Sequence, residues 1–130
     1  MNPFSTIDLL LELDVDKMSI SSSCSPRKLS RSPETPFSTA RLLVGDFDVA
    51  HALLIDLVGE YFEYRRLKPR LRFVVRPLAI CHRDISPIET RILRELTLGA
   101  GSRHTVVTLD PTVSVQSMEK LFKIDKARSG

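Results

Sequence analysis

The sequence predicts an α/β fold in which a short parallel sheet is flanked by helices. Residues 71–76 and 105–109 are rich in β-branched and aromatic side chains, which is typical of strands. From residue 48 onward these strands alternate with three segments of helical periodicity. A strand–helix–strand crossover of this length implies parallel strands. With 130 residues, 42% of them hydrophobic, and a net charge of +3, the chain has the size and composition of one domain with its own core.

The first 40 residues give less regular signals. In residues 7–15 the apolar side chains alternate too imperfectly to decide between a strand and a short helix, and we favour a helix capped by Ser5 or Thr6. Residues 19–40 are rich in Ser and Pro and poor in apolar side chains, which predicts a loop or linker. The chain is therefore divided into a weakly ordered N-terminal segment with its linker (1–40), an α/β unit (41–124) and a frayed tail (125–130).

The first clear helix begins near residue 48. Asp46 or Asp48 stands where an N-cap belongs, and the helix should end before Pro69. Its apolar residues recur at the spacing of one broad helical face: Val49, Ala50, Leu53, Leu54, Leu57, Val58, Tyr61 and Phe62.

A capping box marks the start of the second helix. Ser86 is its N-cap, Pro87 takes the first helical position, and Glu89 takes the third. Gly99-Ala100-Gly101 should end this helix, because Gly accepts the left-handed conformation found after a helix. The predicted buried stripe comprises Ile88, Ile92, Leu93 and Leu96.

The last predicted helix follows the second strand. Asp110-Pro111 repeats the pairing of an N-cap with Pro, and the apolar face comprises Val115, Met118, Leu121 and Phe122. Two parallel strands alone would leave both sheet edges unpaired. Either the N-terminal segment adds a third strand or the strands belong to a larger sheet, and we favour the larger sheet.

Composition narrows the class of protein. No apolar run approaches the roughly 18–20 residues of a membrane span, and the N-terminus lacks the pattern of a signal peptide. The two cysteines, Cys24 and Cys81, form neither a disulfide framework nor a zinc-binding pair. The basic residues at 27–31 and 65–76 are too sparse for a nucleic-acid footprint. We therefore expect a cytoplasmic protein with free thiols.

Residues 89–111 carry a longer motif. Glu89 is followed by the pair Arg94-Glu95, by Gly99-Ala100-Gly101-Ser102-Arg103, and, after an apolar strand, by Asp110-Pro111. In this motif the chain resembles the MreB family of bacterial actin-like, rod-shape-determining proteins. The resemblance covers roughly residues 41–122 and is extended by Gly45-Asp46-Phe47-Asp48-Val49, Lys68-Pro69-Arg70 and Arg31-Ser32-Pro33. It implies a truncated or divergent relative of part of the first lobe of the family's actin-like (ribonuclease-H-like) fold.

The departures from the family concern its nucleotide site. The family holds ATP with two glycine-rich loops, the first being an Asp-x-Gly-Thr-type turn after the first strand. Residues 7–12 take that place here, and no Gly or Thr follows them. The second loop and the second lobe would lie past residue 130. Asp110 alone matches an acid of the family's hydrolytic site, and we interpret it as a helix cap. We therefore expect no ATPase activity, no catalytic, cofactor-binding or metal-binding residues, and no cofactor.

The remaining candidate residues have plainer interpretations. His82 begins a His-Arg-Asp sequence like that of a protein-kinase catalytic loop, but the other kinase motifs are missing, which favours a loop histidine. His51 and His104 are far in sequence from any Cys or acid at metal-ligand spacing. Cys81 follows an apolar strand and is interpreted as a small buried hydrophobe.

Two functions from different classes follow. The first is a non-catalytic MreB-like protein that acts by self-association, or by binding MreB-type filament proteins, in a cell-shape or cytoskeletal context. The alternative is a small regulatory binding module whose basic linker, Arg27–Arg31, contacts nucleic acid or an acidic partner. Steep loss of binding with added salt would favour the alternative.

Overall fold

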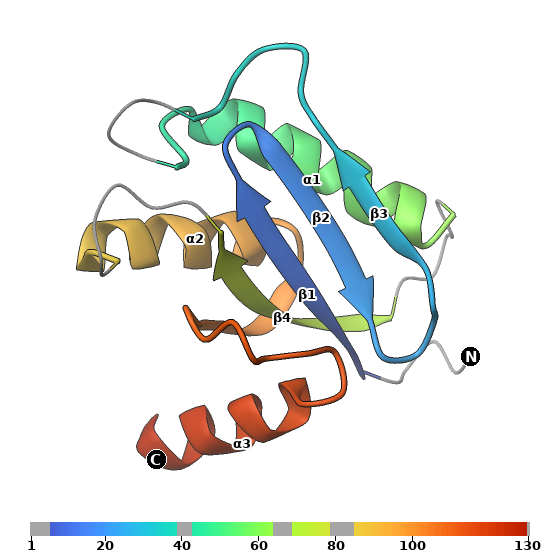
Figure 1. Cartoon of the computed structure of the whole chain (residues 1–130), viewed down its shortest axis with the longest axis vertical. Helices are drawn as coiled ribbons and strands as arrows, with labels where there is room; N and C mark the ends of the chain where they lie inside the picture. Colours follow the sequence, from blue (N-terminus) through green and yellow to red (C-terminus); the bar gives the residue numbers. More distant parts are fainter. Residues whose placement is uncertain (1–5, 39–42, 64–68, 79–84, 130) are drawn as a thin grey trace.

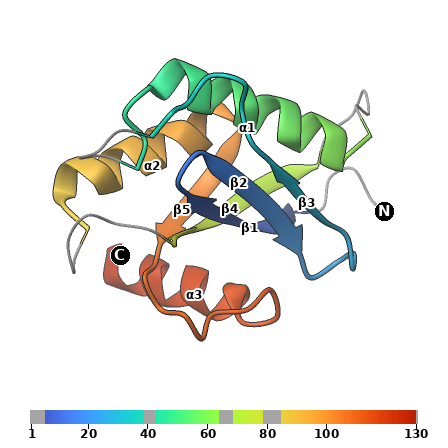
Figure 2. The same ribbon diagram turned by 45° about the horizontal axis from the view of Figure 1, so that its top comes forward.

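The protein has three layers, with one sheet between two layers of helices (Figures 1 and 2). The computed structural model describes residues 6–38, 43–63, 69–78 and 85–129. The helices are α1 (Phe47–Tyr61), α2 (Pro87–Gly99) and α3 (Met118–Ser129). The strands are β1 (Thr6–Asp14), β2 (Lys17–Ser22), β3 (Lys28–Arg31), β4 (Arg70–Pro77) and β5 (Ser102–Val107). The predicted α/β class is confirmed.

The sheet is mixed and has five strands in the order β3-β2-β1-β4-β5. β2 pairs antiparallel with both β1 and β3, whereas β4 runs parallel to β1 and β5 runs parallel to β4. The sheet therefore has more strands than the two parallel strands that the sequence predicts. The N-terminal segment contributes the other three, β1, β2 and β3, so the expectation that the two strands belong to a larger sheet outside this segment is not needed.

Residues 7–15 form strand β1 and its turn, so the helix that we favoured there is wrong. β1 is the central strand, and both of its faces are covered. Leu9, Leu11 and Leu13 lie in the core under α1 and α2, whereas Leu10 lies in the core under α3. A strand buried on both faces has an almost continuous apolar sequence, which hides the alternation that identifies a strand.

The prediction of a loop throughout residues 19–40 is wrong where β2 and β3 lie. Met18 and Ile20 of β2 are fully buried, and the strand pairs with β1 over six residues. Ser19 and Ser22 of the same strand are small enough to be buried too, and the Ser22 hydroxyl lies 2.7 Å from the Tyr61 hydroxyl and is hydrogen-bonded to it. Pairing with a distant apolar strand thus outweighs the low strand propensity of serine.

The helices α1 and α2 begin where their caps predict. The Asp46 side chain accepts a hydrogen bond from the Val49 amide, and Ser86 and Glu89 form the complete capping box. Gly101 after α2 has a φ of +96°, as a residue following a helix end often does. Within the predicted stripe of α2, Leu93 and Leu96 are buried, but Ile88 is 69% exposed, so its predicted burial is wrong.

The C-terminal part of the chain differs from the prediction in its boundaries. β5 starts three residues earlier than predicted, at Ser102. Asp110 does not cap a helix, because α3 begins only at Met118. α3 continues through residues 125–129, which we had taken as a frayed tail.

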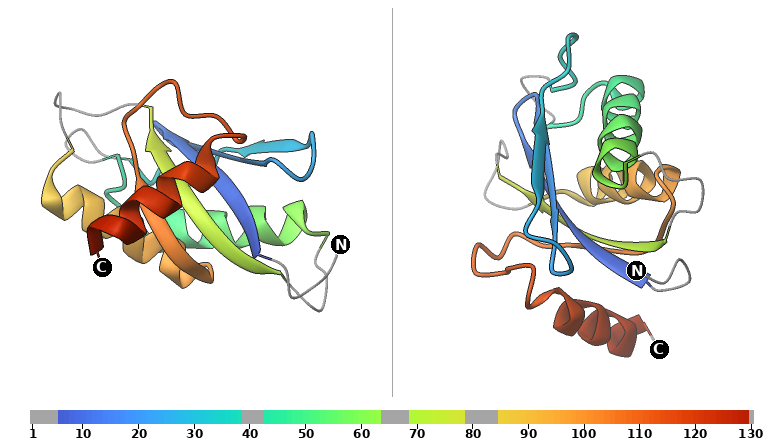
Figure 3. Two further views of the ribbon diagram at one scale, coloured as in Figure 1. Left: turned by 90° about the horizontal axis from the view of Figure 1, so that it is seen from below. Right: turned by 90° about the vertical axis from the view of Figure 1, so that its right-hand side faces the viewer.

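The two faces of the sheet carry separate cores. The larger core fills the space between the sheet and α1 and α2, and Phe37 and Phe73 are fully buried in it. The smaller core lies between the sheet and α3, seen side-on in Figure 3. It is formed by Leu10, Val74, Val113, Met118 and Phe122.

Candidate functional site

The best-ordered polar cluster lies on the α3 side of the sheet, where β1 and β4 run side by side. Asp8 and Arg72 face each other in register and form a two-pronged ion pair, with Nε–Oδ1 2.8 Å and Nη2–Oδ2 3.0 Å. Glu12 and Arg76 repeat the pair four residues along, with Nη2–Oε2 2.9 Å. We call these four residues the ion-pair ladder.

The Glu12 end of the ion-pair ladder extends to a second cation. Lys28 of β3 reaches across β2, and its Nζ lies 3.3 Å from Glu12 Oε1. Burial alone would raise the pKa of the Glu12 carboxyl. The hydrogen bonds and positive charges of Arg76 and Lys28 outweigh that effect and lower the pKa below its ordinary value. Glu12 is therefore an ionised structural partner and is poorly suited to act as a general acid.

Arg76 also fixes the chain after β5. Its Nη1 donates hydrogen bonds to the backbone carbonyls of Asp110 and Val113. The Asp110 carboxylate accepts hydrogen bonds from the Thr112 amide at 2.9 Å and the Thr112 hydroxyl at 2.7 Å. These bonds lower the pKa of the exposed Asp110 carboxyl. The one acid that matches the family's hydrolytic site thus closes a local turn.

The first hairpin turn lies at Val15 and Asp16, and not within residues 7–12 where the resemblance places a phosphate loop. The turn contains no glycine, and Asp16 itself takes a positive φ of 49°. The Asp16 carboxylate accepts hydrogen bonds from the amides of Phe37 and Ser38, at 2.9 and 2.7 Å. The turn therefore holds the chain after β3 through the Asp16 carboxylate.

The two described histidines, His51 and His104, have different partners. His51 stacks on Phe47, with ring centroids 5.7 Å apart. His104 lies 2.6 Å from a carboxylate oxygen of Asp125 and packs against Phe122, contacts between β5 and α3 that sequence spacing did not indicate. His82 and Cys81 fall outside the described residues, and Cys24 is an exposed free thiol. In the described parts of the chain, no three side chains gather as a metal site.

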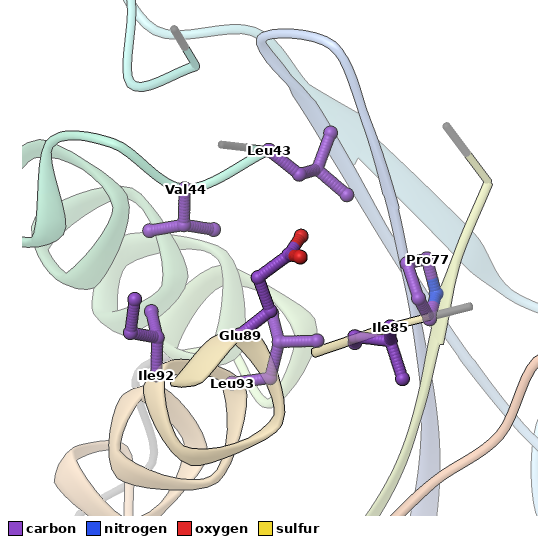
Figure 4. A pocket seen from close by; sticks show the side chains of 7 residues that line it. All are labelled: Leu43, Val44, Pro77, Ile85, Glu89, Ile92 and Leu93. Carbon is purple, nitrogen blue, oxygen red and sulfur yellow. The ribbon is translucent and has the colours of Figure 1, made fainter. Parts of the chain in front are cut away.

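The described structure contains at least three hollows. Figure 4 shows the first, where the Glu89 carboxylate points among apolar side chains near the starts of α1 and α2. Its volume of about 10 Å³ is room for roughly one water molecule, and Glu89 is already bonded to Ser86. It is lined by Leu43, Val44, Pro77, Ile85, Glu89, Ile92 and Leu93. The second, an open hollow of about 510 Å³, lies between the β2–β3 turn and Val115–Gln116 and is lined mainly by polar side chains, four of them serines. The third, of about 570 Å³, lies on the outer side of α2, where Arg91, Arg94, Glu95 and Leu98 are among its lining residues.

The basic residues Arg27, Lys28 and Arg31, in β3 and just before it, are engaged within the molecule. Arg31 pairs with Glu60 of α1, and Lys28 pairs with Glu12. Arg27 donates a hydrogen bond to the Tyr61 carbonyl at 3.2 Å and lies over the Tyr61 ring. These cations hold β3 and the turn before it against α1 and β1.

The sequence did contain a signal for the ion-pair ladder. Acids stand four apart in β1, at 8 and 12, and arginines stand four apart in β4, at 72 and 76. The pairing of β1 with β4 spans 64 residues, so the signal is readable only once the register is known.

No protein-family model matches the chain, and no curated protein matches it. Among the described helices, none is long and apolar enough to cross a membrane.

Proposed function

We propose that this protein is a non-catalytic relative of part of the first lobe of MreB-type, actin-like proteins, and that it acts by protein–protein association in the cytoplasm. The observation that carries the proposal is the order and direction of the strands. An antiparallel meander of β1, β2 and β3 is continued by β4 and β5, both parallel to β1 and joined through α1 and α2 on one face. A ribonuclease-H-like lobe is built on a sheet of this kind, which supports the resemblance carried by residues 89–111.

The first hairpin supports a non-catalytic role. A phosphate-binding turn offers converging backbone amides, and glycine lets the backbone approach the phosphate. Here Val15 and Asp16 form the turn, and the Asp16 carboxylate is committed to the amides of Phe37 and Ser38. Asp110 is likewise committed to Thr112. Among the described residues, both candidate positions thus carry a carboxylate that is engaged in local hydrogen bonds.

The same contacts weigh against the alternative of a module that binds nucleic acid through Arg27–Arg31. Arg27, Lys28 and Arg31 each lie within ion-pair distance of a glutamate of this chain. Binding a phosphate backbone would require breaking those pairs, which hold β3 against α1 and β1.

Co-sedimentation tests the association. The chain is mixed with preformed filaments of an MreB-type protein at about 0.1 M and about 0.5 M salt, and the pellet is compared with that of an unrelated protein of matched size and charge. We expect the chain to pellet at both salt concentrations and the control to stay in solution. A pellet lost at the higher salt would favour the charge-driven alternative, and no pellet at either salt would contradict binding to such filaments.

Calorimetric titration with Mg-ATP tests the absence of catalysis. We expect no binding heat at tens of micromolar protein. A dissociation constant in the low micromolar range would overturn the non-catalytic assignment and would mean that the first hairpin binds phosphate despite its carboxylate.

A further inference from the structure

The two edges of the sheet differ in how they are protected. The β3 edge is four residues long and carries Lys28 and Arg31, which are held in ion pairs with Glu12 and Glu60. Short, charged edge strands are a common protection against pairing with other chains. β5 forms the other edge (Figure 2), and residues 104–109 contain no Lys, Arg, Asp, Glu or Pro. We call residues 104–109 the β5 edge, and it lacks the protection that the β3 edge has.

The backbone of the β5 edge has groups free for pairing. The Thr108 amide donates a hydrogen bond to the Val75 carbonyl of β4 at 2.9 Å. Successive residues of a strand direct their amides and carbonyls to opposite edges, so those of Thr105 and Val107 point away from β4. Among the described strands, none lies beyond β5. The irregularity in its pairing with β4 falls between Ser102 and Thr105, so the pairing that follows is regular.

The side chains of the β5 edge are incompletely covered. Val106 packs against the smaller core and Val107 against the larger core, so neighbouring residues contribute to both faces of the sheet. Both are only half-buried, whereas Val74 and Val75, opposite them in β4, are fully buried. A further strand would cover Val106 and Val107 in the way that β5 covers their partners in β4.

We infer that the β5 edge is a docking site for an extended segment of a partner protein, which adds one more strand to the sheet. The segment would form main-chain hydrogen bonds with Thr105 and Val107 and would place β-branched side chains beside Val106 and Val107. The inference goes beyond the proposed function, because a segment paired with β5 requires no filament.

The charges that flank the β5 edge specify the segment further. Arg103 precedes the edge and Asp110 follows it, and both side chains are exposed. The segment should therefore carry an acid at the end that meets Arg103 and a base at the end that meets Asp110. Between these charges it should carry uncharged, β-branched residues, as the β5 edge itself does.

A second copy of this chain fits the β5 edge less well than such a segment. If two β5 edges met in register and parallel, Arg103 would lie opposite Arg103. If they met antiparallel, residues whose backbone groups point outward, such as Thr105 and Val107, would have to face one another. Since these stand at every second position, no such register sets Arg103 directly opposite Asp110. The charges therefore favour a partner with a different sequence.

Amide hydrogen exchange of the full chain, followed by nuclear magnetic resonance, tests whether the β5 edge is open. We expect the Val107 amide to exchange at least about tenfold faster than the amides of Val106 and Thr108, which point to β4. Equal protection of all three amides in the dilute chain would overturn the inference. Protection of Val107 that rises with chain concentration would assign the edge to a second copy and would also overturn it.

Peptide binding tests the docking itself. The probe is a fluorescently labelled peptide, Glu-Thr-Val-Thr-Val-Thr-Lys, and its binding to the full chain is measured by fluorescence anisotropy. We expect a dissociation constant between about 10 µM and about 1 mM, because the contact is small. Two control peptides carry N-methyl groups on alternate amides, one set in each. One of them should bind at least about tenfold more weakly and the other within about threefold of the parent, since only one set of amides faces β5.

Arg103→Glu tests the charges at the ends of the segment. This variant should bind the Glu-to-Lys peptide about threefold more weakly, and it should bind a peptide with Lys at both ends about threefold more tightly than the wild-type chain does. The matched control is Lys17→Glu, an exposed position in β2 on the other side of the sheet, which should change neither affinity. Circular dichroism checks that both variants are folded.

The inference would be overturned by a Glu-to-Lys peptide that does not bind at about 1 mM, by two N-methylated peptides that bind equally, or by equal effects of Arg103→Glu and Lys17→Glu. None of these results bears on pelleting with filaments. Failure of the β5 docking site and failure of the proposed function are therefore distinguishable.

Discussion

Phe122 is the side chain through which α3 should contribute most to the stability of the fold. It is only 1% exposed and lies at the centre of the smaller core, under Leu10 and Val74. The Arg72 guanidinium carbon lies 4.3 Å from the centroid of its ring, so the ring also covers one end of the ion-pair ladder. Phe122→Ala would remove the ring and leave α3 with Met118 as its fully buried contact in this core.

The cost of Phe122→Ala can be estimated from that burial. Truncating a fully buried phenylalanine costs about 3–5 kcal/mol, and a partly shielded cation–π contact accounts for about 0.5–1 kcal/mol of it. Against a total stability of about 5–15 kcal/mol this is a large fraction. Urea denaturation followed by far-ultraviolet circular dichroism measures the loss as a fall in the midpoint concentration.

The matched control for Phe122→Ala lies two residues along the same helix. Ile124 is 51% exposed, so Ile124→Ala should change stability by less than about 0.5 kcal/mol. A loss below about 1 kcal/mol for Phe122→Ala, or equal losses for the two variants, would refute the second core. It would mean that α3 covers the sheet without stabilising it.

Three further predictions follow from the caps, charges and close contacts. Glu12→Gln should lower the free energy of unfolding at pH 7 by about 1–2 kcal/mol, measured by urea denaturation. Because the folded-state pKa of Glu12 is lowered, this loss should shrink as pH falls from about 5 through that pKa. A loss that does not change with pH would contradict the pairing. Gly99→Ala places a Cβ 2.5 Å from His51 Nε2, so this substitution alone should destabilise the fold by about 1 kcal/mol. In a His51→Ala background the same substitution should stabilise the helix, because alanine has the higher helix propensity. A destabilisation that persists in that background would show that the clash is not the cause. Ser86→Ala should lower the melting temperature by a few degrees, equivalent to about 1 kcal/mol, and an unchanged melt would mean that the capping box contributes nothing.

The parts of the fold that sequence predicted are those with local signals. The N-cap of α1 at Asp46 and the capping box of α2 at Ser86 depend on residues within one helical turn, and both were located correctly. β4 was recognised because its β-branched residues form a compact run bounded by prolines. In each case the energetic reason for the element lies within the segment itself.

The errors arise where distant contacts decide. β1 has apolar side chains on both faces because α3, more than 100 residues later, covers the second face. β2 is a strand because it pairs with β1 and the Ser22 hydroxyl meets Tyr61 of α1. The misassigned role of Asp110 has a similar cause, because Arg76 of β4 holds the chain after β5 in a turn before α3 can start.

The candidate site was predictable only as single residues. Asp110 was identified by its place before Pro111, which we interpreted as the start of a helix. In the structure its carboxylate accepts hydrogen bonds from Thr112 in a local turn, and the sequence pattern of such a turn is the same as that of a helix cap. The ion-pair ladder requires the register of β1 against β4, which aligns Asp8 with Arg72. The sequence alone shows the charged residues and their spacing within each strand, but which acid pairs with which arginine depends on the alignment of β1 with β4 in the folded sheet.

The central position of β1 has a consequence for how the chain must fold during synthesis. β1 leaves the ribosome before β2 and β3, and β2 can pair with β1 and then with β3 at once, because those two pairings span few residues. Its other edge stays unpaired until β4, 64 residues later, has been synthesised, and its second face stays uncovered until Phe122 has been synthesised. Long-range pairing of this kind slows folding, and an apolar strand that waits with one open edge is a target for non-specific pairing with other chains. Asp8 and Glu12 on that waiting strand place two charges among its leucines, and they would oppose such pairing until Arg72 and Arg76 arrive.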